Sequence, residues 1–428
     1  MDFKEAVTYL YNSRPPFHQV GAAAYKPGLE NTLRLMAHVG NPHEALRAVH
    51  VAGTNGKGST SHLIAAALQA SGLKVGLFTS PHLVSLTERI RINGRPIPEE
   101  EVAAWVTKHQ AFLDELQPSF FETMTAMGFD WFVREKVDVA VVETGLGGRL
   151  DSTNVLTPIL SVITNIGMDH MEFLGNTLSR IAREKAGIMK AGVPCVIGES
   201  HPQTMNVFLE KAQECGILGE GLETTNCKIW FADQCGYLRR CRLREAPECE
   251  LHGIYQEHNL QTAYVALRAL SVQQSVFSIQ HSAIREGFAH VVSLTGLRGR
   301  WETLCEKPLT ICDIGHNSHG LQYVAQQLRE LSNPQVWIVF GMVNDKDTDV
   351  VMRLLPRGDK YHYIFTKPST QRARSAQEML ELWNNEGIAI EDPKEAITYA
   401  QTHANEEDAI FIGGSNYLVA DALPLFTH

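Results

Sequence analysis

The sequence contains no run of three consecutive Lys or Arg residues, and no apolar stretch approaches the ~18 residues that a membrane-spanning helix needs. Its formal net charge is -10. A protein that mainly binds nucleic acid needs a basic face to neutralise phosphates, so this charge argues against that class of partner. We expect neither a nucleic-acid partner nor a membrane partner.

The eight cysteines are scattered and form no Cys-x-x-Cys pair. Cys227, Cys235, Cys241 and Cys249 lie near one another, but their spacings match no common zinc-binding pattern. We therefore expect free thiols in a reducing compartment. The first twenty residues are charged at positions 2, 4 and 5 and have no apolar core, unlike a signal peptide, so a cytoplasmic location is predicted.

Short, nearly continuous runs of Val, Ile and other apolar residues alternate with longer helical patterns. Such runs, bounded by glycine and joined by helices, are typical of a parallel sheet that is buried on both faces. The first part of the chain therefore predicts a doubly wound α/β domain. The apolar runs are residues 47–54, 74–80, 137–148, 159–167 and 193–198, and the helical patterns include 59–70, 99–116 and 178–190.

The pattern changes near residue 225. Residues 225–256 are strand-like but interrupted by polar residues, which indicates a small antiparallel hairpin set at the domain edge, and a helical pattern returns at 257–273. Residues 293–302 contain Gly296 and Gly299 and are interpreted as a linker or hinge. Alternation then resumes, so we predict two α/β domains, 1–295 and 296–428, the second with apolar runs at 309–315, 335–341, 361–367 and 409–414.

The segment VHVAGTNGKGSTSH, residues 49–62, joins an apolar run to a helical pattern through a glycine-rich turn. Backbone N–H groups in such a turn can approach phosphate oxygens, a lysine can neutralise them, and a hydroxyl can bind Mg²⁺. The match to G-x-x-x-x-G-K-[ST] is imperfect, because Val51 replaces the first glycine and Gly58 follows the lysine, so an ordinary turn is the alternative. The predicted nucleotide-binding residues are Gly53, Thr54, Asn55, Gly56, Lys57, Gly58, Ser59 and Thr60.

Polar side chains follow three of the later apolar runs. Ser80, Glu143 and His170 stand at or just beyond points where predicted strands end. Ligands of a parallel sheet gather at the carboxyl ends of its strands, and Mg²⁺ prefers hard oxygen ligands. A carboxylate directly after an apolar run is costly unless it faces positive charge, which favours Glu143. His170 taken alone is more often an ordinary hydrogen-bonded residue than a metal ligand.

Several motifs together resemble one family. GTNGKGST, FTSPHLVSLTERIRING, ETGLGGRLDSTN, NIGMDHMEFLG and IAREKAGIMK occur in order, followed by EHNLQTA, LRGRWE, DIGHNSHG and IGGSNYLVAD. They resemble the folylpolyglutamate synthase and bifunctional dihydrofolate synthase branch of the Mur ligase family. The resemblance implies a P-loop ATPase domain with a doubly wound, mostly parallel sheet, a smaller Rossmann-like C-terminal domain, and an active site in the cleft between them.

The implied activity is ATP-dependent formation of an amide bond. L-Glutamate would be added to dihydropteroate, to the γ-carboxylate of reduced folates, or to both, through an acyl phosphate. The implied cofactors are ATP, two Mg²⁺ ions and K⁺, and the implied partners are these small molecules, with the protein as a monomer. A catalytic set of Lys57, Lys185, Arg300 and His316 is implied.

The resemblance also implies roles for single residues near the nucleotide. Lys57 and Ser59 would hold the ATP phosphates, Ser80 and Glu143 would hold one Mg²⁺, and His170 would help to hold a second. The other implied nucleotide contacts are Asn259 on the adenine side, Arg300 at the phosphates and Asp313 at the ribose or another part of the nucleotide.

The substrate side of the implied site is carried by loops. Asp151 would contact the pterin, because a carboxylate can pair with two N–H donors in one plane; an Asx turn is the alternative. Pro81 and His82 belong to a long polar segment that resembles the folate-site loop of the family, and a surface loop ending in a hairpin is equally compatible. His316 is implied on the phosphate or glutamate side and Ser415 near the incoming glutamate. The family pattern Asp-Gly-Ala-His-Asn reads Asp-Ile-Gly-His-Asn at 313–317, so the turn there is expected to differ.

Two roles can be predicted for Lys185. Family members often carry a carbamylated lysine at this position, which would turn a cation that repels Mg²⁺ into a hard anionic ligand. The alternative is a helix-surface lysine paired with Glu184, and the sequence alone favours it. The resemblance favours the carbamate.

Three other functions compete. A GTPase switch would share the phosphate loop, but no Asn-Lys-x-Asp guanine reader is present; residues 344–347 read Asn-Asp-Lys-Asp. A Mur-family ligase acting on a cell-wall nucleotide precursor is the nearest alternative, and a non-enzymatic interaction module is the most distant. The choice between dihydropteroate and reduced folates stays open.

Overall fold

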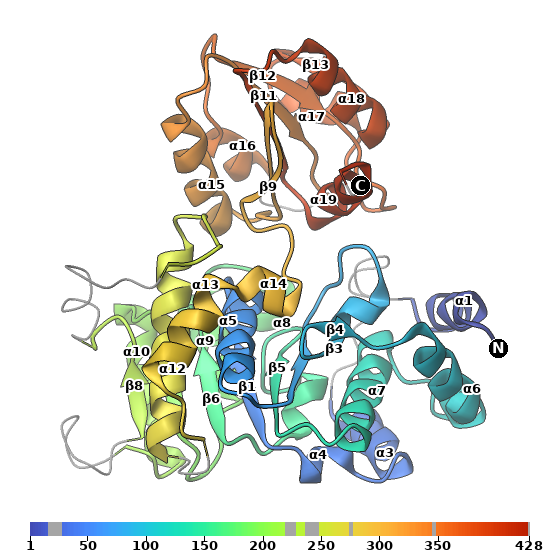
Figure 1. Ribbon diagram of the computed structural model, residues 1–428, viewed down its shortest axis with the longest axis vertical. Coiled ribbons are helices and arrows are strands. Elements are labelled where there is room, and N and C mark those ends of the chain that lie inside the picture. The colour runs from blue at the N-terminus through green and yellow to red at the C-terminus, as the bar shows by residue number, and fades with distance from the viewer. Residues whose placement is uncertain (16–27, 219–227, 236–247, 274–276, 345–347, 427–428) are drawn as a thin grey trace. The chain divides into compact units, whose positions relative to one another are not determined.

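The computed structural model describes residues 1–15, 28–218, 228–235, 248–273, 277–344 and 348–426. The chain forms two compact units (Figure 1). The first unit comprises residues 1–82, 86–250 and 256–297, and the second comprises 83–85, 251–255 and 298–428. Two short segments, residues 83–85 and 251–255, therefore belong to the second unit, and the rest of that unit begins at Arg298.

The first unit is built on an eight-stranded sheet with the order β4-β3-β2-β5-β1-β6-β7-β8. The strands from β2 to β8 in this order are parallel, whereas β3 and β4 form an antiparallel hairpin at one edge. The mostly parallel, doubly wound sheet is confirmed. Its strands are β1 (Ala48–Ala52), β2 (Val75–Phe78), β3 (Ile90–Ile92), β4 (Arg95–Pro96), β5 (Val139–Glu143), β6 (Leu160–Ile163), β7 (Cys195–Ile197) and β8 (Ile229–Phe231).

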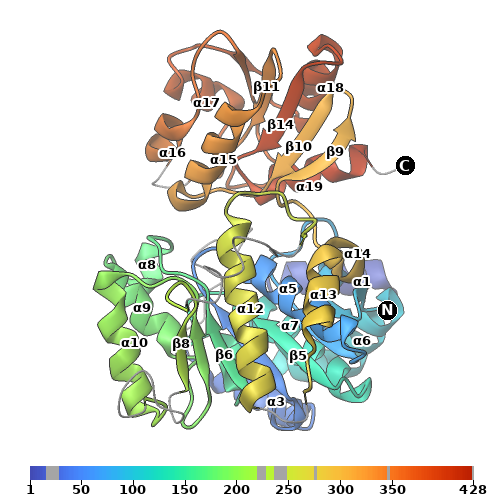
Figure 2. The same ribbon diagram turned by 60° about the vertical axis from the view of Figure 1, so that its left-hand side comes forward.

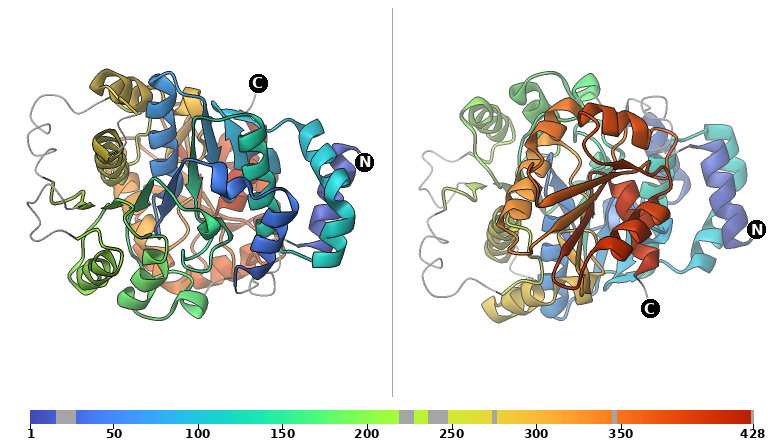
Figure 3. Two further views of the ribbon diagram at one scale, coloured as in Figure 1. Left: turned by 90° about the horizontal axis from the view of Figure 1, so that it is seen from below. Right: turned by 90° about the horizontal axis from the view of Figure 1, so that it is seen from above.

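Helices cover both faces of this sheet, so every residue of β1 and β5 is buried. The helices α5, α12 and α13 pack together over one face (Figure 2), and α3, α6 and α7 share a core with the other (Figure 3). The helices are α1 (Phe3–Ser13), α3 (Glu30–His38), α4 (Pro42–Ala45), α5 (Lys57–Ala70), α6 (Glu99–Leu116), α7 (Phe120–Arg134), α8 (Met171–Leu174), α9 (Leu178–Ala186), α10 (Pro202–Glu214), α12 (Gln256–Gln273), α13 (His281–Ala289) and α14 (Val291–Thr295), with 3-10 turns η2 (Leu86–Arg89) and η3 (Ser152–Val155).

Local signals explain where these helices begin and end. The predicted helix 99–116 is observed with the same bounds, because three glutamates occupy its first turn and Gln117 ends it in the left-handed region. The helix α9 ends at Ala186, four residues before its predicted end. A Cβ added at Gly187 would lie 2.4 Å from the Cα of Arg149, so a neighbouring loop packs closely where the helix stops.

The antiparallel hairpin predicted within 225–256 is wrong for the part that the structure describes. Ile229–Phe231 forms β8, which pairs in parallel with β7. Ile229 and Phe231 are buried in a core cluster while Trp230 is half-buried, the alternation expected of an edge strand. Residues 236–247 lie outside the described residues.

The second unit contains a six-stranded sheet with the order β13-β12-β11-β14-β10-β9. All neighbours are parallel except β9, which pairs antiparallel with β10. The predicted second α/β sheet is therefore confirmed. Its elements are β9 (Glu302–Glu306), β10 (Leu309–Asp313), α15 (Ser318–Glu330), β11 (Val336–Phe340), α16 (Thr348–Leu354), β12 (Tyr361–Phe365), α17 (Ala376–Leu382), β13 (Ile388–Ala389), α18 (Pro393–His403), β14 (Ala409–Gly413), α19 (Asn416–Ala422) and η4 (Leu423–Leu425).

Two further observations bear on the predictions from composition. Among the helices that the structure describes, none combines the length and apolar character needed to cross a bilayer. Cys235 is a free thiol, while Cys227 and Cys241 lie outside the described residues.

Candidate active site

The glycine-rich segment forms the turn between β1 and α5. Gly53 has φ 153° and Gly56 has φ 80°, values that favour glycine. A Cβ at Gly53 would lie 1.8 Å from Thr164 Oγ1, and one at Gly56 would lie 2.1 Å from Asn259 Oδ1. Side chains from the residue after β6 and from α12 therefore pack closely against the turn, and the segment has the strand–turn–helix setting of a phosphate-binding loop despite its imperfect motif.

The end of β6 holds this loop in place. The Thr54 N–H donates to the Asn165 carbonyl oxygen at 3.0 Å, and the Asn55 N–H donates to Asn165 Oδ1 at 2.9 Å. The Thr164 hydroxyl donates to the Asn55 carbonyl oxygen at 2.6 Å. These bonds fix the backbone of the turn, and the remaining N–H groups at the start of α5 are placed for an anion.

Lys57 and Ser59 occupy the positions expected of phosphate-binding side chains. Lys57 Nζ donates to the carbonyl oxygens of Gly53 and Thr54, both at 3.1 Å, so its charge lies over the loop. Ser59 is buried, and its Oγ accepts a hydrogen bond from Gln256 Nε2 at 3.2 Å. Gln256 is a residue that the sequence reasoning missed, although it is the first residue of α12 and directly precedes a quoted motif.

Asn259 lies one helical turn beyond Gln256, and its Nδ2 donates to Gln256 Oε1 at 2.7 Å. Its Oδ1 faces Gly56, as the close approach described above shows. The structure thus places Asn259 against the phosphate loop. Its role on the adenine side stays a prediction.

Lys185 is buried, with 4% of its surface exposed, and its Nζ donates to the Gly53 carbonyl oxygen at 2.7 Å. Burial, followed by the charge of Lys57, lowers the pKa of Lys185 to about 7. The alternative of a surface lysine paired with Glu184 is therefore wrong. Glu184 instead pairs with Arg149 of the neighbouring loop, with 3.0 Å between its Oε1 and Arg149 Nη2, and both side chains are partly exposed.

Glu143 and Ser80 stand at the ends of the neighbouring parallel strands β5 and β2. Glu143 is 3% exposed, and one of its carboxylate oxygens accepts a hydrogen bond from the Ser80 N–H at 3.1 Å. The Thr144 hydroxyl, which follows Glu143, is buried without a hydrogen-bond partner in the described part of the chain. A buried carboxylate at the carboxyl end of a parallel strand is a hard oxygen donor, so Glu143 fits Mg²⁺ with its water ligands.

His170 differs from the other predicted metal ligands because it is exposed. It has φ 47° just before α8, and its Nε2 lies 3.8 Å from an Asp169 carboxylate oxygen. Within the described residues, no group of three or more His, Cys, Asp or Glu side chains is arranged to hold a metal. A metal site here therefore depends on other donors as well, such as a hydroxyl, a modified lysine or nucleotide phosphates.

The Asp151 carboxylate is used by its own loop. It is 5% exposed and accepts hydrogen bonds from the N–H groups of Gly145 at 2.9 Å, Leu146 at 2.8 Å and Thr153 at 3.0 Å, and from the Thr153 hydroxyl. Burial raises the pKa of Asp151, and these hydrogen bonds oppose the rise. The alternative of an Asx-type turn is what the structure shows, and the pterin contact stays a prediction.

The predicted folate-site loop begins with Ser80 and Pro81 and carries His82. Arg89 Nε donates to His82 Nδ1 at 2.8 Å, so the ring proton resides on Nε2, which lies 3.2 Å from the Tyr11 hydroxyl oxygen. Arg89 is itself buried and stacks over the Phe120 ring at 5.3 Å. His82 is thereby held in one orientation. The loop ends in the hairpin of β3 and β4.

In the second unit, the predicted nucleotide residues lie around the end of β10. Asp313 is 2% exposed and accepts hydrogen bonds from the Tyr255 hydroxyl at 2.5 Å, the Trp301 N–H at 2.8 Å and the Gly315 N–H at 2.7 Å. Burial raises the pKa of Asp313, whereas its hydrogen bonds and the charge of Arg300 oppose the rise. Asp313 thus connects the turn that follows β10 with Trp301, the residue before β9, and Tyr255 is a second residue that the sequence reasoning missed.

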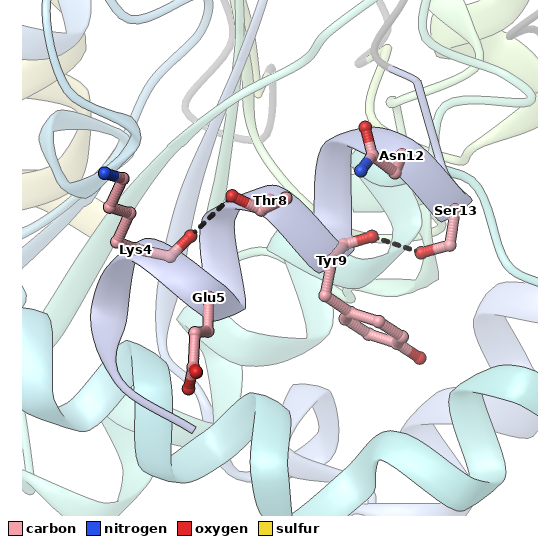
Figure 4. Close-up of a pocket in the computed structure, with 6 residues that line it drawn as sticks. All are labelled: Lys4, Glu5, Thr8, Tyr9, Asn12 and Ser13. Atoms are coloured by element: carbon pink, nitrogen blue, oxygen red, sulfur yellow. Dashed lines mark hydrogen bonds between the residues drawn. The ribbon is translucent and has the colours of Figure 1, made fainter.

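The other predicted residues of this unit are less enclosed or serve as helix caps. Arg300 is half-buried, and its Nη1 lies 3.5 Å from the Gly299 carbonyl oxygen. His316 is exposed, with Nδ1 3.1 Å from the Ile314 carbonyl oxygen. The buried Ser415 hydroxyl caps α19 by accepting from the N–H groups of Tyr417 and Leu418. The pocket drawn in Figure 4 lies along α1 in the first unit, and none of the six residues that line it, from Lys4 to Ser13, is a predicted site residue.

Comparison with known proteins shows the family to which this chain belongs. Residues 51–237 match the Mur ligase middle domain, and residues 299–416 match the Mur ligase glutamate ligase domain. The chain is 35% identical over 412 residues to the dihydrofolate synthase/folylpolyglutamate synthase of Bacillus subtilis. The aligned region covers 92% of this chain and 94% of that protein. The chain belongs to the Mur ligase family.

Two solved structures are also similar to this chain. An Escherichia coli FolC structure in complex with DHPP and ADP has a TM-score of 0.81 at 28% identity, covering 99% of this chain and 97% of that one. A bifunctional folylpolyglutamate synthase/dihydrofolate synthase with Mn, AMPPNP and L-glutamate bound has a TM-score of 0.82 at 28% identity, covering 99% and 98%. The predicted family, fold class and enzyme class, an ATP-dependent amide ligase, are confirmed, and nucleotide and divalent metal use is supported.

Proposed function

We propose that this Mur ligase adds L-glutamate to dihydropteroate, to the γ-carboxylate of reduced folates, or to both, at the cost of one ATP. The observation that carries the proposal is the buried Lys185, whose Nζ lies on the carbonyl oxygen of the phosphate-loop residue Gly53. A GTPase switch has no need of a second buried lysine at its phosphate loop. The similar proteins are dihydrofolate synthases and folylpolyglutamate synthases, which supports folate-linked substrates over a cell-wall nucleotide precursor.

The reaction proceeds in two steps. A carboxylate oxygen of the pterin substrate attacks the γ-phosphorus of ATP, the bond to the β-phosphate oxygen breaks, and ADP leaves. The amine of L-glutamate then attacks the acyl carbon of the acyl phosphate, and the tetrahedral intermediate expels inorganic phosphate as the amine loses its proton. The protein contributes mainly positioning and neutralisation of charge on the transferring group.

The residues of the first unit divide these tasks. The phosphate loop and Lys57 hold the phosphate chain, and Ser59, fixed by Gln256, presents its hydroxyl beside them. Ser80 and Glu143 are proposed to hold Mg²⁺, which when bound neutralises phosphate charge. His170 is the proposed contributor to a second ion, and K⁺ stays a prediction.

Lys185 is proposed to react with CO₂. A pKa of about 7 leaves a large share of the amine neutral at physiological pH, and only the neutral amine is a nucleophile. Its nitrogen would attack the carbon of CO₂ and release one proton to water, which leaves a carbamate anion. The change removes a buried cation next to Lys57 and supplies two oxygen donors.

The remaining residues are proposed to act on the substrates. Arg300 and Asp313 would bind the nucleotide, His316 and Ser415 the incoming glutamate, and Pro81 and His82 the folate. Asp151 would act on the pterin either by direct contact or by holding the loop that follows Glu143. A monomeric state and a cytoplasmic location stay predictions.

One assay tests the activity. The purified protein is incubated with ATP, Mg²⁺, labelled L-glutamate and either dihydropteroate or tetrahydrofolate, with omission of each component in turn. We expect labelled amide product and ADP in equal amounts, dependent on every component. ADP release that is unchanged without glutamate and pterin, or product only with a cell-wall nucleotide precursor, would refute the proposal. GTP in place of ATP tests the switch alternative.

A further inference from the structure

A histidine is buried in the centre of the main sheet, on the strand that leads into the phosphate loop. His50 belongs to β1 and has 0% of its surface exposed. Its Nε2 lies 2.8 Å from the Thr153 hydroxyl oxygen, and its Nδ1 is buried without a hydrogen-bond partner in the described part of the chain. Neither residue has a role in the reaction scheme above.

The direction of the hydrogen bonds follows from the chemistry of the groups. Thr153 has one hydroxyl proton, and it donates this proton to an oxygen of the Asp151 carboxylate, which also accepts the Thr153 N–H. The Thr153 oxygen must therefore accept from His50, so the imidazole carries its proton on Nε2. Burial and the charge of Lys190 lower the pKa of His50 to about 3, which keeps the ring neutral at any working pH.

This chain of bonds ends on the loop that follows Glu143. The second oxygen of the Asp151 carboxylate accepts the N–H groups of Gly145 and Leu146. His50 on β1, Thr153 and Asp151 thus form a relay, and the relay ends two and three residues beyond Glu143. The side chains of His50, Thr153 and Asp151 thus fix the first backbone turn after Glu143, the proposed metal ligand.

The same loop is tied to the helix that carries Lys185. Asn154 Nδ2 donates to the carbonyl oxygens of Arg149 at 2.9 Å and Gly187 at 3.1 Å. The Arg149 N–H donates to the Glu184 carbonyl oxygen at 2.8 Å. A Cβ at Gly148 would lie 3.0 Å from the Lys185 carbonyl oxygen, which shows how closely the loop and the helix approach. Residues 144–155 therefore connect the backbone near Glu143 with the backbone at Lys185.

Stability alone does not account for this histidine. An imidazole with one buried and unsatisfied nitrogen costs free energy that an apolar residue of similar size would avoid. What the imidazole supplies is one donor to Thr153, which leaves the threonine proton free for Asp151. The arrangement resembles the outer hydrogen-bond partners that orient ligating residues at metal sites.

We propose that His50 is a positioning residue of the active site, which acts through Thr153 and Asp151 to fix the 144–155 loop and thereby the spacing of Glu143 and Lys185. The inference rests on the proposed function, because it takes these two residues as metal-binding groups. It assigns His50 no contact with substrate or metal. It predicts that metal affinity changes when the relay is cut, while the phosphate loop keeps its affinity for nucleotide.

The experiment measures Mn²⁺ binding directly by electron paramagnetic resonance, with ADP present, for the wild type and for relay variants. Thr153→Val removes the hydroxyl at nearly constant volume and should weaken Mn²⁺ binding by about tenfold, the lower end of the effect of losing an outer hydrogen-bond partner. Thr153→Ser keeps the hydroxyl and should bind Mn²⁺ like the wild type. His50→Gln, whose amide can donate in place of Nε2, should retain more affinity than His50→Leu.

Two controls separate positioning from general loss of stability. Thr204→Val on α10 also removes the hydroxyl of a fully buried threonine in the first unit, which bonds to the His201 carbonyl oxygen and not to the relay. It should lower the melting temperature without changing Mn²⁺ affinity. The double variant His50→Leu/Thr153→Val should bind Mn²⁺ no more weakly than Thr153→Val alone, since both changes cut one relay.

The proposal is overturned if Thr153→Val binds Mn²⁺ as the wild type does, or if the effects of the two single changes multiply in the double variant. Failure of the proposed function looks different. In that case the wild type forms no glutamyl product, whereas the Mn²⁺ measurement still reports whether the relay fixes a metal site.

Discussion

Lys185 Nζ lies 2.7 Å from the carbonyl oxygen of Gly53, so a lysine of α9 donates a hydrogen bond to the phosphate loop more than a hundred residues earlier in the chain. Lys57 Nζ donates to the same carbonyl oxygen at 3.1 Å. Two ammonium groups on one acceptor in a buried setting repel each other, which is why the charge of Lys57 helps to lower the pKa of Lys185. The roles of Lys185 and of the residues around this pair of lysines can be tested by substitution.

Carbamylation of Lys185 is the first prediction. In buffer with ¹³C-labelled bicarbonate, the protein should show a carbamate carbon signal by NMR, and Lys185→Arg should abolish it. Loss of this anion should reduce kcat by about 10²–10³-fold, the usual effect of removing one preorganised charge contact. Lys211→Arg, a change on the exposed face of α10, should leave both the signal and kcat unchanged. A signal that survives in Lys185→Arg would assign the carbamate elsewhere.

The pH dependence of stability gives a second prediction. Burial lowers the pKa of Lys185 from 10.5 to about 7, so between these pH values the unfolded chain binds one proton more than the folded chain. The free energy of unfolding contributed by this group therefore rises as the pH increases from about 7 to 10.5. In buffer free of CO₂, denaturant titrations of Lys185→Met should show a flatter profile over this window. An identical slope in both proteins would contradict a buried Lys185.

Gly56 and Gly72 have similar backbone angles, so a comparison of their alanine variants separates the effect of backbone strain from the effect of steric overlap. Gly56 has φ 80° and would place a Cβ 2.1 Å from Asn259 Oδ1, whereas Gly72 has φ 85° with nothing within 4 Å. Both changes to alanine should cost about 1–2 kcal/mol of stability from the left-handed backbone. Only Gly56→Ala should also weaken ADP binding, by about tenfold or more, equivalent to about 1.4 kcal/mol. Calorimetric titration with ADP checks this, and equal ADP affinities would remove Gly56 from the nucleotide site.

Asp151→Ala tests the loop after β5. The change leaves the N–H groups of Gly145 and Leu146 without their acceptor, at a cost of about 1–3 kcal/mol for each one that stays buried. We expect the KM for dihydropteroate to rise by about tenfold or more while the Kd for ADP stays within about twofold. Steady-state kinetics and ADP titration measure the two quantities. A parallel loss of both would show that Asp151 supports the whole site and not the pterin side.

The sheet of each unit was predictable because its strands are read from local composition. The runs at 47–54 and 137–148 contain mostly apolar residues, and strands of that composition are typical of a sheet covered on both faces, as β1 and β5 are. The helix 99–116 was predictable to the residue because its start and end signals are local. The strand β8 was misjudged because its parallel partner is distant in the sequence: Ile229 pairs with Cys195 of β7, 34 residues earlier. The pairing is made by backbone groups, which the side chains of β8 do not reveal.

The candidate site divides in the same way. The sequence by itself determined that a glycine-rich loop with a lysine follows β1 and that a carboxylate, Glu143, ends β5, since glycine positions and a carboxylate after an apolar run are local facts. Only the tertiary structure decided that Lys185 is buried on Gly53, that Gln256 holds Ser59, and that the Asp151 carboxylate turns back into its own loop. Such contacts depend on distances between segments far apart in the chain, and burial, which sets the charge state of a lysine, exists only once those segments have packed together.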